Sequence, residues 1–145
     1  MKKNVLVHNK SVHIYDRNQP QDTIEVLVPG IYYYGNDRHH LRYEEQLEDH
    51  GNPVTNYLEA DGEEMTITRK GAVQTKMTFR TGVLSLFVYE TPHGVFQMGV
   101  RTHEYRMSGD DERLQFDLHY TLENNGRTVS ECLMRITVTQ GADRD

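Results

Sequence analysis

Apolar and polar side chains alternate along most of the chain. In the clearest run every second residue is apolar: Leu114, Phe116, Leu118, Tyr120 and Leu122. The runs 73–79 and 132–138 repeat this alternation, and no run of similar length keeps helical spacing. A two-residue repeat places successive side chains on opposite faces of a strand. The pattern therefore predicts strands that are buried on one face.

Short turn sequences separate these runs. The sharpest are Asp61-Gly62 and Asn125-Gly126, because both central residues of a two-residue type I′ hairpin need positive φ. Weaker signals lie at Asn18-Gln19-Pro20, Gly35-Asn36-Asp37, Gly51-Asn52-Pro53, Lys70-Gly71, Thr81-Gly82, Pro92-His93-Gly94 and Gly109-Asp110. These nine turns predict about ten strands, mostly joined to their sequence neighbours as a meander.

The composition also favours a sheet, since 3 Ala stand against 31 Val, Ile and Thr. A meander of this length closes on itself to remove its edges. We therefore expect an all-β protein, a single antiparallel meander β-barrel of about 8–10 strands. The barrel would occupy residues 1–140, and residues 141–145 would form a disordered tail. A sandwich of two sheets is the alternative architecture.

One segment and three shorter ones resemble a known family. Residues 89–102, Tyr-Glu-Thr-Pro-His-Gly-Val-Phe-Gln-Met-Gly-Val-Arg-Thr, resemble the YwiB-like proteins, a bacterial family of unknown function. Tyr43-Glu44-Glu45, the Arg69-Lys70-Gly71 turn and the hairpin from Tyr120 to Ser130-Glu131 extend the resemblance along the whole chain. The resemblance implies a calycin-like, lipocalin-related antiparallel β-barrel. It implies no activity and no catalytic residues, and it gives no role to His93.

Charge and cysteine content limit the partners and the compartment. The net charge is −6, so the basic surface that nucleic acid or an anionic membrane attracts is missing. The single cysteine, Cys132, excludes an intramolecular disulfide, and no long apolar stretch begins the chain. We expect a cytoplasmic protein, a monomer or homodimer, that does not bind nucleic acid or insert into membranes.

Alternation also predicts carboxylates inside the barrel. Glu45 shares a face with Leu41, Tyr43 and Leu47. If Phe96, Met98 and Val100 face inward, Thr102 and Glu104 follow them; if Leu84, Leu86 and Val88 face inward, Glu90 lies inward near a rim. A buried carboxylate needs hydrogen bonds, a cation or a proton. Such a cluster is either a polar plug or a ligand site, unless these groups meet water at the rim.

Other chemistry is weakly indicated. His39 and His40 point to opposite faces of a strand, so no metal site is expected. Cys132 lies on an apolar face without a basic sequence neighbour, which favours packing over nucleophilic catalysis. No phosphate-binding, redox or hydrolase motif occurs, and no cofactor is expected. Within Tyr32-Tyr33-Tyr34, Tyr33 must face away from its neighbours, so at least one ring is exposed.

Three functions remain. The first is a non-enzymatic binder of a small, partly apolar, amphipathic ligand inside the barrel, with ligand contacts from Tyr43, Glu45, Glu90, Phe96, Met98 and Tyr120. The second is a protein-interaction module that uses the outer surface near residues 32–34. The third, ranked well below them, is an enzyme with an interior carboxylate as general acid or base, for which no partner residue is evident.

Overall fold

The computed structural model describes residues 2–16, 18–19, 21–46, 53–71 and 74–141. They form ten strands: β1 (Lys3–Ile14), β2 (Asp22–Gly35), β3 (Arg38–Glu45), β4 (Val54–Ala60), β5 (Glu64–Lys70), β6 (Thr75–Arg80), β7 (Leu84–Thr91), β8 (Gly94–Gly109), β9 (Arg113–Asn124) and β10 (Arg127–Gln140). Within these residues, no helix is long and apolar enough to cross a membrane.

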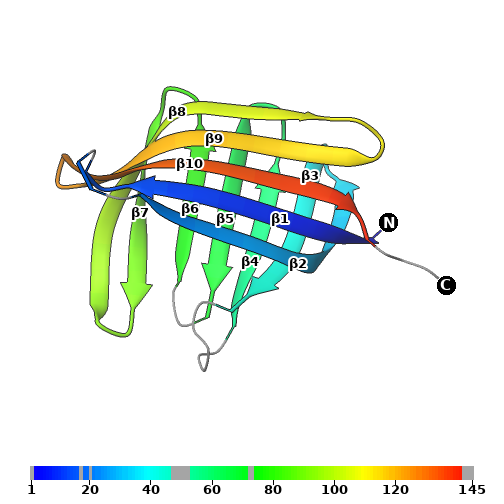
Figure 1. The fold of residues 1–145 in the computed structure, drawn as a ribbon, viewed down its shortest axis with the longest axis horizontal. Coiled ribbons are helices and arrows are strands. Elements are labelled where there is room, and N and C mark those ends of the chain that lie inside the picture. The colour runs from blue at the N-terminus through cyan, green and yellow to red at the C-terminus, as the bar shows by residue number, and fades with distance from the viewer. Residues whose placement is uncertain (1, 17, 20, 47–52, 72–73, 142–145) are drawn as a thin grey trace.

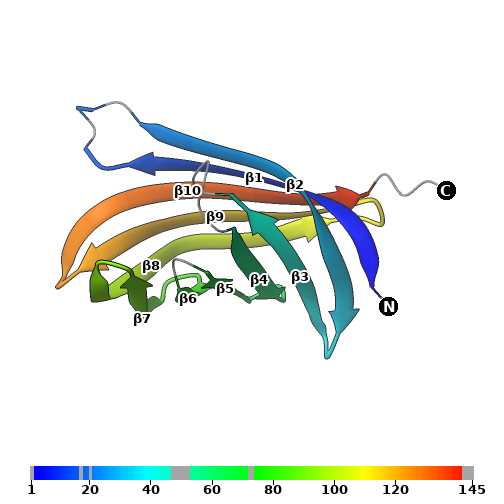
Figure 2. The same ribbon diagram turned by 90° about the horizontal axis from the view of Figure 1, so that it is seen from below.

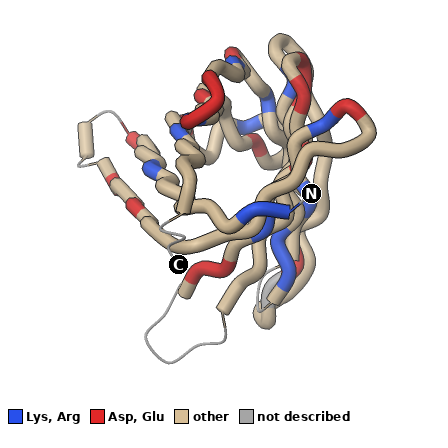
Figure 3. The backbone as a smooth tube through the Cα atoms, turned by 90° about the vertical axis from the view of Figure 1, so that its right-hand side faces the viewer, with Lys and Arg blue, Asp and Glu red and all other residues tan. Residues whose placement is uncertain are grey.

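All ten strands belong to one antiparallel sheet with the order β6-β5-β4-β3-β2-β1-β10-β9-β8-β7. Pairing of β1 with β10, from Val5↔Gln140 to Ile14↔Glu131, joins the two ends of the chain. Strands β8, β9, β10, β1 and β2 cross over β3 to β7 (Figures 1 and 2). In the end-on view the chain encircles one axis (Figure 3). The antiparallel barrel is confirmed, and the sandwich alternative is wrong because the sheet is continuous.

The barrel is nearly closed, and its seam lies between β6 and β7. The two strands are joined by a short turn, yet among the described residues one bridge, Gln74↔Glu90, is the only pair of residues between them. Near the turn, β8 closes the wall instead: Gly82 N donates to Thr102 O, and Thr102 N donates to Val83 O. Between these points the facing edges of β6 and β7 have no ladder.

The interior has an apolar half and a polar half along the same strands. At the end where β1 begins, the core is apolar: Val5, Val7, Leu41, Leu58, Ala60, Met65, Ile67, Phe79, Phe116, Leu118, Ile136 and Val138. Toward the other end of β1, the inward positions become Asn9, Ser11 and His13. On β9 the inward positions alternate with less buried ones as predicted. On β10 the predicted alternation holds from Cys132 to Ile136, but Thr137, which was predicted to oppose them, is also buried.

Two inward assignments were wrong. Leu84, Leu86 and Val88 lie on the outer face of β7, with Leu86 67% exposed, and Glu90 is exposed with them. Phe87 faces the core instead, because β7 pairs with β8 in the register Ser85↔Val100. On β8 an irregularity between Thr102 and Glu104 reverses the alternation, so Thr102 is buried and Glu104 is exposed.

The turns agree with the sequence in part. Asn125 (φ 54°) and Gly126 (φ 78°) both have positive φ, as the two-residue hairpin requires. Asp61-Gly62 does not form such a turn. Asp61 Oδ1 accepts the backbone N–H groups of Glu63 and Glu64, so a side-chain-capped turn connects β4 to β5. The predictions for Leu47, Gly51-Asn52, Val73 and residues 142–145 fall outside the described residues.

Candidate functional site in the polar half of the barrel

Two cross-strand rows of inward residues build the polar half of the interior. The first inner row crosses β3 to β6 through the pairs Tyr43↔Asn56, Asn56↔Arg69 and Arg69↔Thr75. The second inner row crosses β1, β10, β9 and β8 through His13↔Cys132, Cys132↔Tyr120 and Thr102↔Tyr120. Because residues paired across a ladder project to the same face, each row presents its side chains together.

An ion pair lies in the first inner row. Arg69 Nη2 donates to Glu45 Oε1 at 2.7 Å, and Arg69 Nε donates to Asn56 Oδ1 at 3.1 Å. Asn56 Nδ2 also donates to Glu45 Oε1, at 2.9 Å. The Glu45 side chain is 9% exposed and that of Arg69 30%. The interior carboxylate predicted at Glu45 is thus present, and it is held by a cation and an amide.

The phenol of Tyr43 continues this network toward β1. Tyr43 Oη accepts a hydrogen bond from Asn9 Nδ2 at 3.2 Å, and Asn9 Oδ1 accepts one from Ser11 Oγ. Burial raises the pKa of Tyr43 to about 12, so the phenol stays protonated at neutral pH. Its own O–H group is therefore a hydrogen-bond donor inside the barrel.

The second inner row contains a thiol and an imidazole. Cys132 Sγ lies 3.2 Å from His13 Nδ1 and 3.6 Å from Ser130 Oγ. Burial raises the pKa of Cys132 and lowers that of His13, so each stays neutral near pH 7. Sequence reasoning missed His13, because it precedes Cys132 by 119 residues. Cys132 is fully buried, which agrees with the predicted packing role.

Both inner rows end at the seam in a threonine without a partner. Thr75 on β6 is 7% exposed and Thr102 on β8 is 1% exposed. Within the described part of the chain, neither buried Oγ1 atom has a hydrogen-bond partner. A buried hydroxyl in this state costs about 1–3 kcal/mol relative to a satisfied one. Thr75 lies beside the Gln74↔Glu90 bridge and Thr102 beside Gly82 and Val83, toward opposite ends of β6. Each hydroxyl therefore calls for a partner of its own, such as water or a ligand.

A groove of about 450 Å³ opens at this seam. Its lining includes the inward residues Arg69, Thr75 and Phe87 and the outward residues Lys76, Leu86 and Val88. Because residues of both faces line it, the groove crosses the wall of the barrel. It joins the first inner row to the outer surface where β6 and β7 lack a ladder.

The six predicted ligand contacts differ in where they lie. Tyr43, Glu45 and Tyr120 are buried in or beside the two inner rows. Met98 is half-buried and packs against the core, whereas Phe96 is 46% exposed. Glu90 lies on the outer face and lines the seam groove. Arg69, Thr75 and Thr102 complete the cluster; Thr102 was expected to face inward, but Arg69 and Thr75 were not predicted as site residues.

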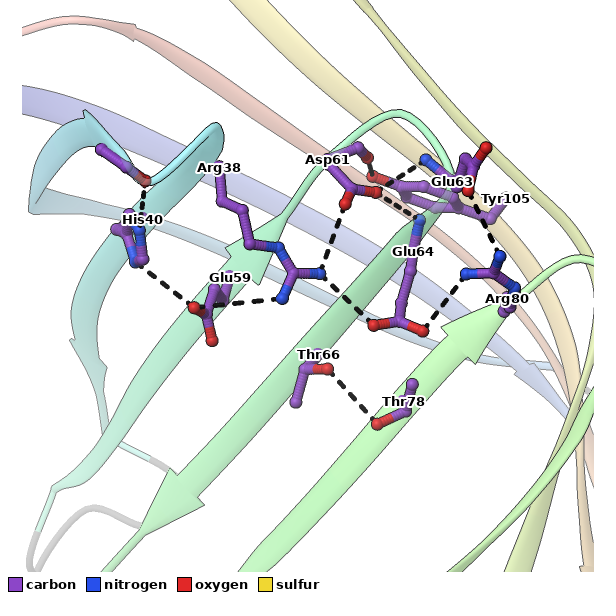
Figure 4. A network of polar contacts seen from close by, with 11 residues as sticks. Arg38, His40, Glu59, Asp61, Glu63, Glu64, Thr66, Thr78, Arg80 and Tyr105 are labelled. Carbon is purple, nitrogen blue, oxygen red and sulfur yellow. Dashed lines mark hydrogen bonds and ion pairs between the residues drawn. The ribbon is translucent and has the colours of Figure 1, made fainter.

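A second polar network closes the opposite end of the barrel (Figure 4). Arg38 Nη2 lies 3.3 Å from Glu64 and 3.6 Å from Asp61, and Arg80 lies 3.4 Å from Glu64. Tyr105 Oη donates to Asp61 O at 2.6 Å. These groups pair with one another at the turn between β4 and β5, which is typical of a structural network. Among the described residues, no three His, Cys, Asp or Glu side chains are placed to hold a metal ion.

The fold and the interior define a nearly closed, ten-stranded antiparallel barrel with a polar cluster beside its seam. The chain belongs to the family described as "Domain of unknown function (DUF1934)", whose model matches residues 7–136. It is similar to the crystal structure of the ywiB protein from Bacillus subtilis, with 23% identity and a TM-score of 0.83. That match covers 97% of this chain and 94% of the other. No curated protein matches.

Proposed function

We propose that this protein is a non-enzymatic binder of one small, partly apolar ligand, held between the two inner rows and reached through the seam groove. The observation that carries the proposal is the buried, unpartnered hydroxyl of Thr75, which lines the seam groove. The unpartnered hydroxyl of Thr102, toward the other end of β6, is a second unsatisfied group of the interior. Selection for stability alone disfavours such groups, because valine fills similar space without a hydroxyl to satisfy.

The free hydrogen-bonding capacity of the cluster supports a ligand that accepts hydrogen bonds. Thr75, Thr102 and Tyr43 each carry an O–H donor, and the bonds of Arg69 to Glu45 and Asn56 use two of its roughly five N–H donors. A carbonyl, hydroxyl or carboxylate oxygen in the seam groove would satisfy Thr75 and Arg69, which both line it. Phe87 in the groove wall and Met98 beside it offer apolar contacts for the remainder of an amphipathic ligand.

The test compares ligand capture by the natural protein and by a hydroxyl-deleted variant. After incubation with a small-molecule extract of the source cells, native mass spectra should show a reproducible added mass. Thr75→Val/Thr102→Val should lose that mass and also unfold at a higher temperature, because the unpartnered hydroxyls are gone. Thr55→Val, on the outer face of β4, is the matched control and should retain the adduct.

Two results would count against this function. The first is an adduct that survives in Thr75→Val/Thr102→Val, since the ligand would then lie elsewhere. The second is bare protein in every sample together with a destabilised double variant, since the two hydroxyls would then serve packing alone.

An interaction module that uses the outer surface is the second candidate. The sequence predicted at least one exposed ring in Tyr32-Tyr33-Tyr34, and Tyr33 is 37% exposed and Tyr34 54% exposed. Large rings are enriched at protein interfaces. A homodimer in sedimentation that is lost in Tyr33→Ser/Tyr34→Ser would favour it; an unchanged monomer would oppose it.

Location and domain organisation complete the proposal. A cytoplasmic, single-domain protein over residues 1–140 accords with the free, buried thiol of Cys132, which needs no oxidising compartment. A calycin-like relationship accords with the meander and with a ligand inside the barrel. An enzymatic role for Glu45 has less support, because Arg69 and Asn56 already occupy its Oε1 atom.

A further inference from the structure

A second concave region lies outside the barrel, across β2 to β6. This outer groove has a volume of about 550 Å³, which is within the range of small-molecule sites. Its lining includes Tyr33, His40, Arg42, Tyr57, Thr68 and Lys76. All of these side chains point away from the interior, because the neighbouring positions Leu41, Leu58 and Ile67 are buried in the core. The outer groove is therefore separate from the polar cluster inside.

The strand register arranges the groove as a line of cationic, aromatic and hydroxyl groups. Arg42 pairs with Tyr57, Tyr57 with Thr68, and Thr68 with Lys76. Adjacent strands are about 4.8 Å apart, so the line from Arg42 to Lys76 spans roughly 14 Å. Thr68 lies between the two cations and offers a hydroxyl.

A flat aromatic surface stands beside the Arg42 end of this line. The rings of Tyr33 and His40 stack with centroids 4.3 Å apart and an interplanar angle of 5°. His40 Nε2 lies 3.1 Å from Gly35 O, which fixes the imidazole against the strand (Figure 4). The stack covers one face of the Tyr33 ring, and the residue remains 37% exposed. Such a supported ring is suited to stacking against another planar group.

The charge of the groove contrasts with that of the whole protein. Among the residues that the structure describes, six arginines lie within 4.0 Å of a carboxylate: Arg38, Arg69, Arg80, Arg101, Arg106 and Arg135. Within the described part of the chain, Arg42 and Lys76 make no such pair; Arg42 instead lies 5.8 Å from the centre of the Tyr57 ring. Two exposed cations without carboxylate partners thus share one groove in a chain of net charge −6. Glu59 also lines the groove, and its Oε2 atom lies 4.0 Å from Arg38 Nη1 and 4.0 Å from His40 Nδ1. This arrangement is complementary to a compact anion.

We infer that the outer groove binds a free nucleoside di- or triphosphate, with the base stacked on Tyr33 and the phosphates extended from Arg42 past Thr68 toward Lys76. The distance from the aromatic stack to Arg42 supports this order, because His40 and Arg42 are two residues apart on one strand, or about 7 Å. The roughly 14 Å line beyond Arg42 accommodates a phosphate chain. A long polyanion is disfavoured, since the net charge of −6 opposes its extension beyond the groove.

Isothermal titration of the full chain with ATP, adenosine and inorganic triphosphate tests this inference. ATP should bind with a dissociation constant below about 1 mM, and more tightly than either part. Arg42→Gln and Lys76→Gln should each weaken ATP by about tenfold. Lys10→Gln makes the same change of charge on the outer face of β1 and should have less than about a twofold effect. Tyr33→Leu should weaken ATP but not triphosphate.

Four results would overturn the inference. They are no saturable ATP binding at millimolar concentration, an effect of Lys10→Gln equal to that of Arg42→Gln, triphosphate binding as tight as ATP, or tighter binding of an oligoadenylate or an oligoglutamate peptide than of ATP. Circular dichroism spectra of the surface variants establish that each is folded. The outer groove shares no side chain with the two inner rows, but Thr68 and Lys76 also line the seam groove. Arg42→Gln and Tyr33→Leu lie outside the seam groove, so their effects distinguish the nucleotide from the ligand proposed for the interior.

Discussion

At the scale of single residues, two glycines show how closely the turns constrain the backbone. Gly126, in the turn between β9 and β10, has a φ of 78°, and an added Cβ would meet nothing within 4 Å. Gly109, at the end of β8, has a φ of 155°, and its Cβ would lie 2.3 Å from Arg113 O and 2.9 Å from Leu114 Cα. Both positions disfavour a side chain, but only Gly109 also lacks the space for one.

The two alanine substitutions should therefore differ in cost. Gly126→Ala should lower the free energy of unfolding by about 1 kcal/mol, because it strains φ alone. Gly109→Ala should lower it by about 3 kcal/mol or more, because the backbone of the next strand must also move. Urea denaturation of both variants measures the difference. Equal losses would mean that the β8–β9 turn relaxes freely around a methyl group.

Two half-buried histidines give the protein a pH dependence. Burial lowers the pKa of both His13 and His39 below the unfolded value of 6.5. As the pH falls, these histidines are therefore protonated in the unfolded chain before they are protonated in the folded protein. Their contribution to the free energy of unfolding is complete above about pH 6.5 and is lost as the pH drops toward the folded pKa values.

We expect the temperature of the unfolding midpoint to decrease when the pH is lowered from about 7.5 to about 5.5, a range above that in which carboxylates titrate. His13→Gln/His39→Gln should reduce this fall, because glutamine has no charge to gain. Calorimetry at both pH values makes the comparison. A variant that retains the whole fall would assign the dependence to other groups.

At the scale of strands, the sequence predicted the alternation of side chains more accurately than it predicted which face of each strand points into the barrel. For β3 both the alternation and the inward face were predicted correctly. Leu41, Tyr43 and Glu45 point inward, and the polar residues between them, such as Arg42, point outward. For β7 the more uniformly apolar set, which includes Leu86, is outside, because pairing with β8 commits Phe87 to the core. On β8 the irregularity after Thr102 reverses the phase, and local alternation does not reveal it.

The sequence predicted those features of the candidate site that depend on the pattern within one strand, but not the contacts between strands. Glu45 was recognised because its apolar neighbours make a carboxylate unusual. Arg69 was not, because it stands beside a turn, where a cation is ordinary. Its contact with Glu45 depends on the registers of β3 with β4 and of β4 with β5, which bring the two residues together across Asn56. His13 and Cys132 meet only because the two ends of the chain pair.

The ion pair in the first inner row should behave as a coupled unit. Arg69→Met leaves Glu45, 9% exposed, without its cation, and should lower the free energy of unfolding by about 3–5 kcal/mol. Glu45→Gln/Arg69→Met removes both charges, and its loss should be smaller than that of Arg69→Met alone. Urea denaturation of both variants and of Glu45→Gln completes the cycle. Additive losses would show that the two side chains contribute independently.

At the scale of the whole molecule, the seam concentrates the open features of the barrel. β6 and β7 adjoin in sequence, yet each is held by a ladder to another strand, β6 to β5 and β7 to β8. Among the described residues, one bridge, between Gln74 just before β6 and Glu90 on β7, joins their facing edges. The unpartnered hydroxyl of Thr75 lies on β6 at this seam and lines the groove that crosses the wall there, whereas Thr102 lies where β8 bonds to the turn between β6 and β7. Separation of these edges breaks fewer hydrogen bonds than opening any ladder of the sheet, so the seam is the natural route into the interior.

A reversible cross-link across the seam tests this route. Gln74 and Glu90 exchange two backbone hydrogen bonds of 3.0 Å, which places their Cα atoms about 5.5 Å apart, within the range for a disulfide. In a Cys132→Ser background, oxidised Gln74→Cys/Glu90→Cys should gain about 3 kcal/mol of stability over its reduced form, as expected for a loop of about 15 residues. It should also exchange the captured ligand more slowly, as measured by mass spectrometry after dilution into competitor. The reduced form of the same variant is the control. A cross-link that stabilises the protein but leaves the exchange rate unchanged would place the entry route elsewhere, because the edges of β6 and β7 could no longer separate.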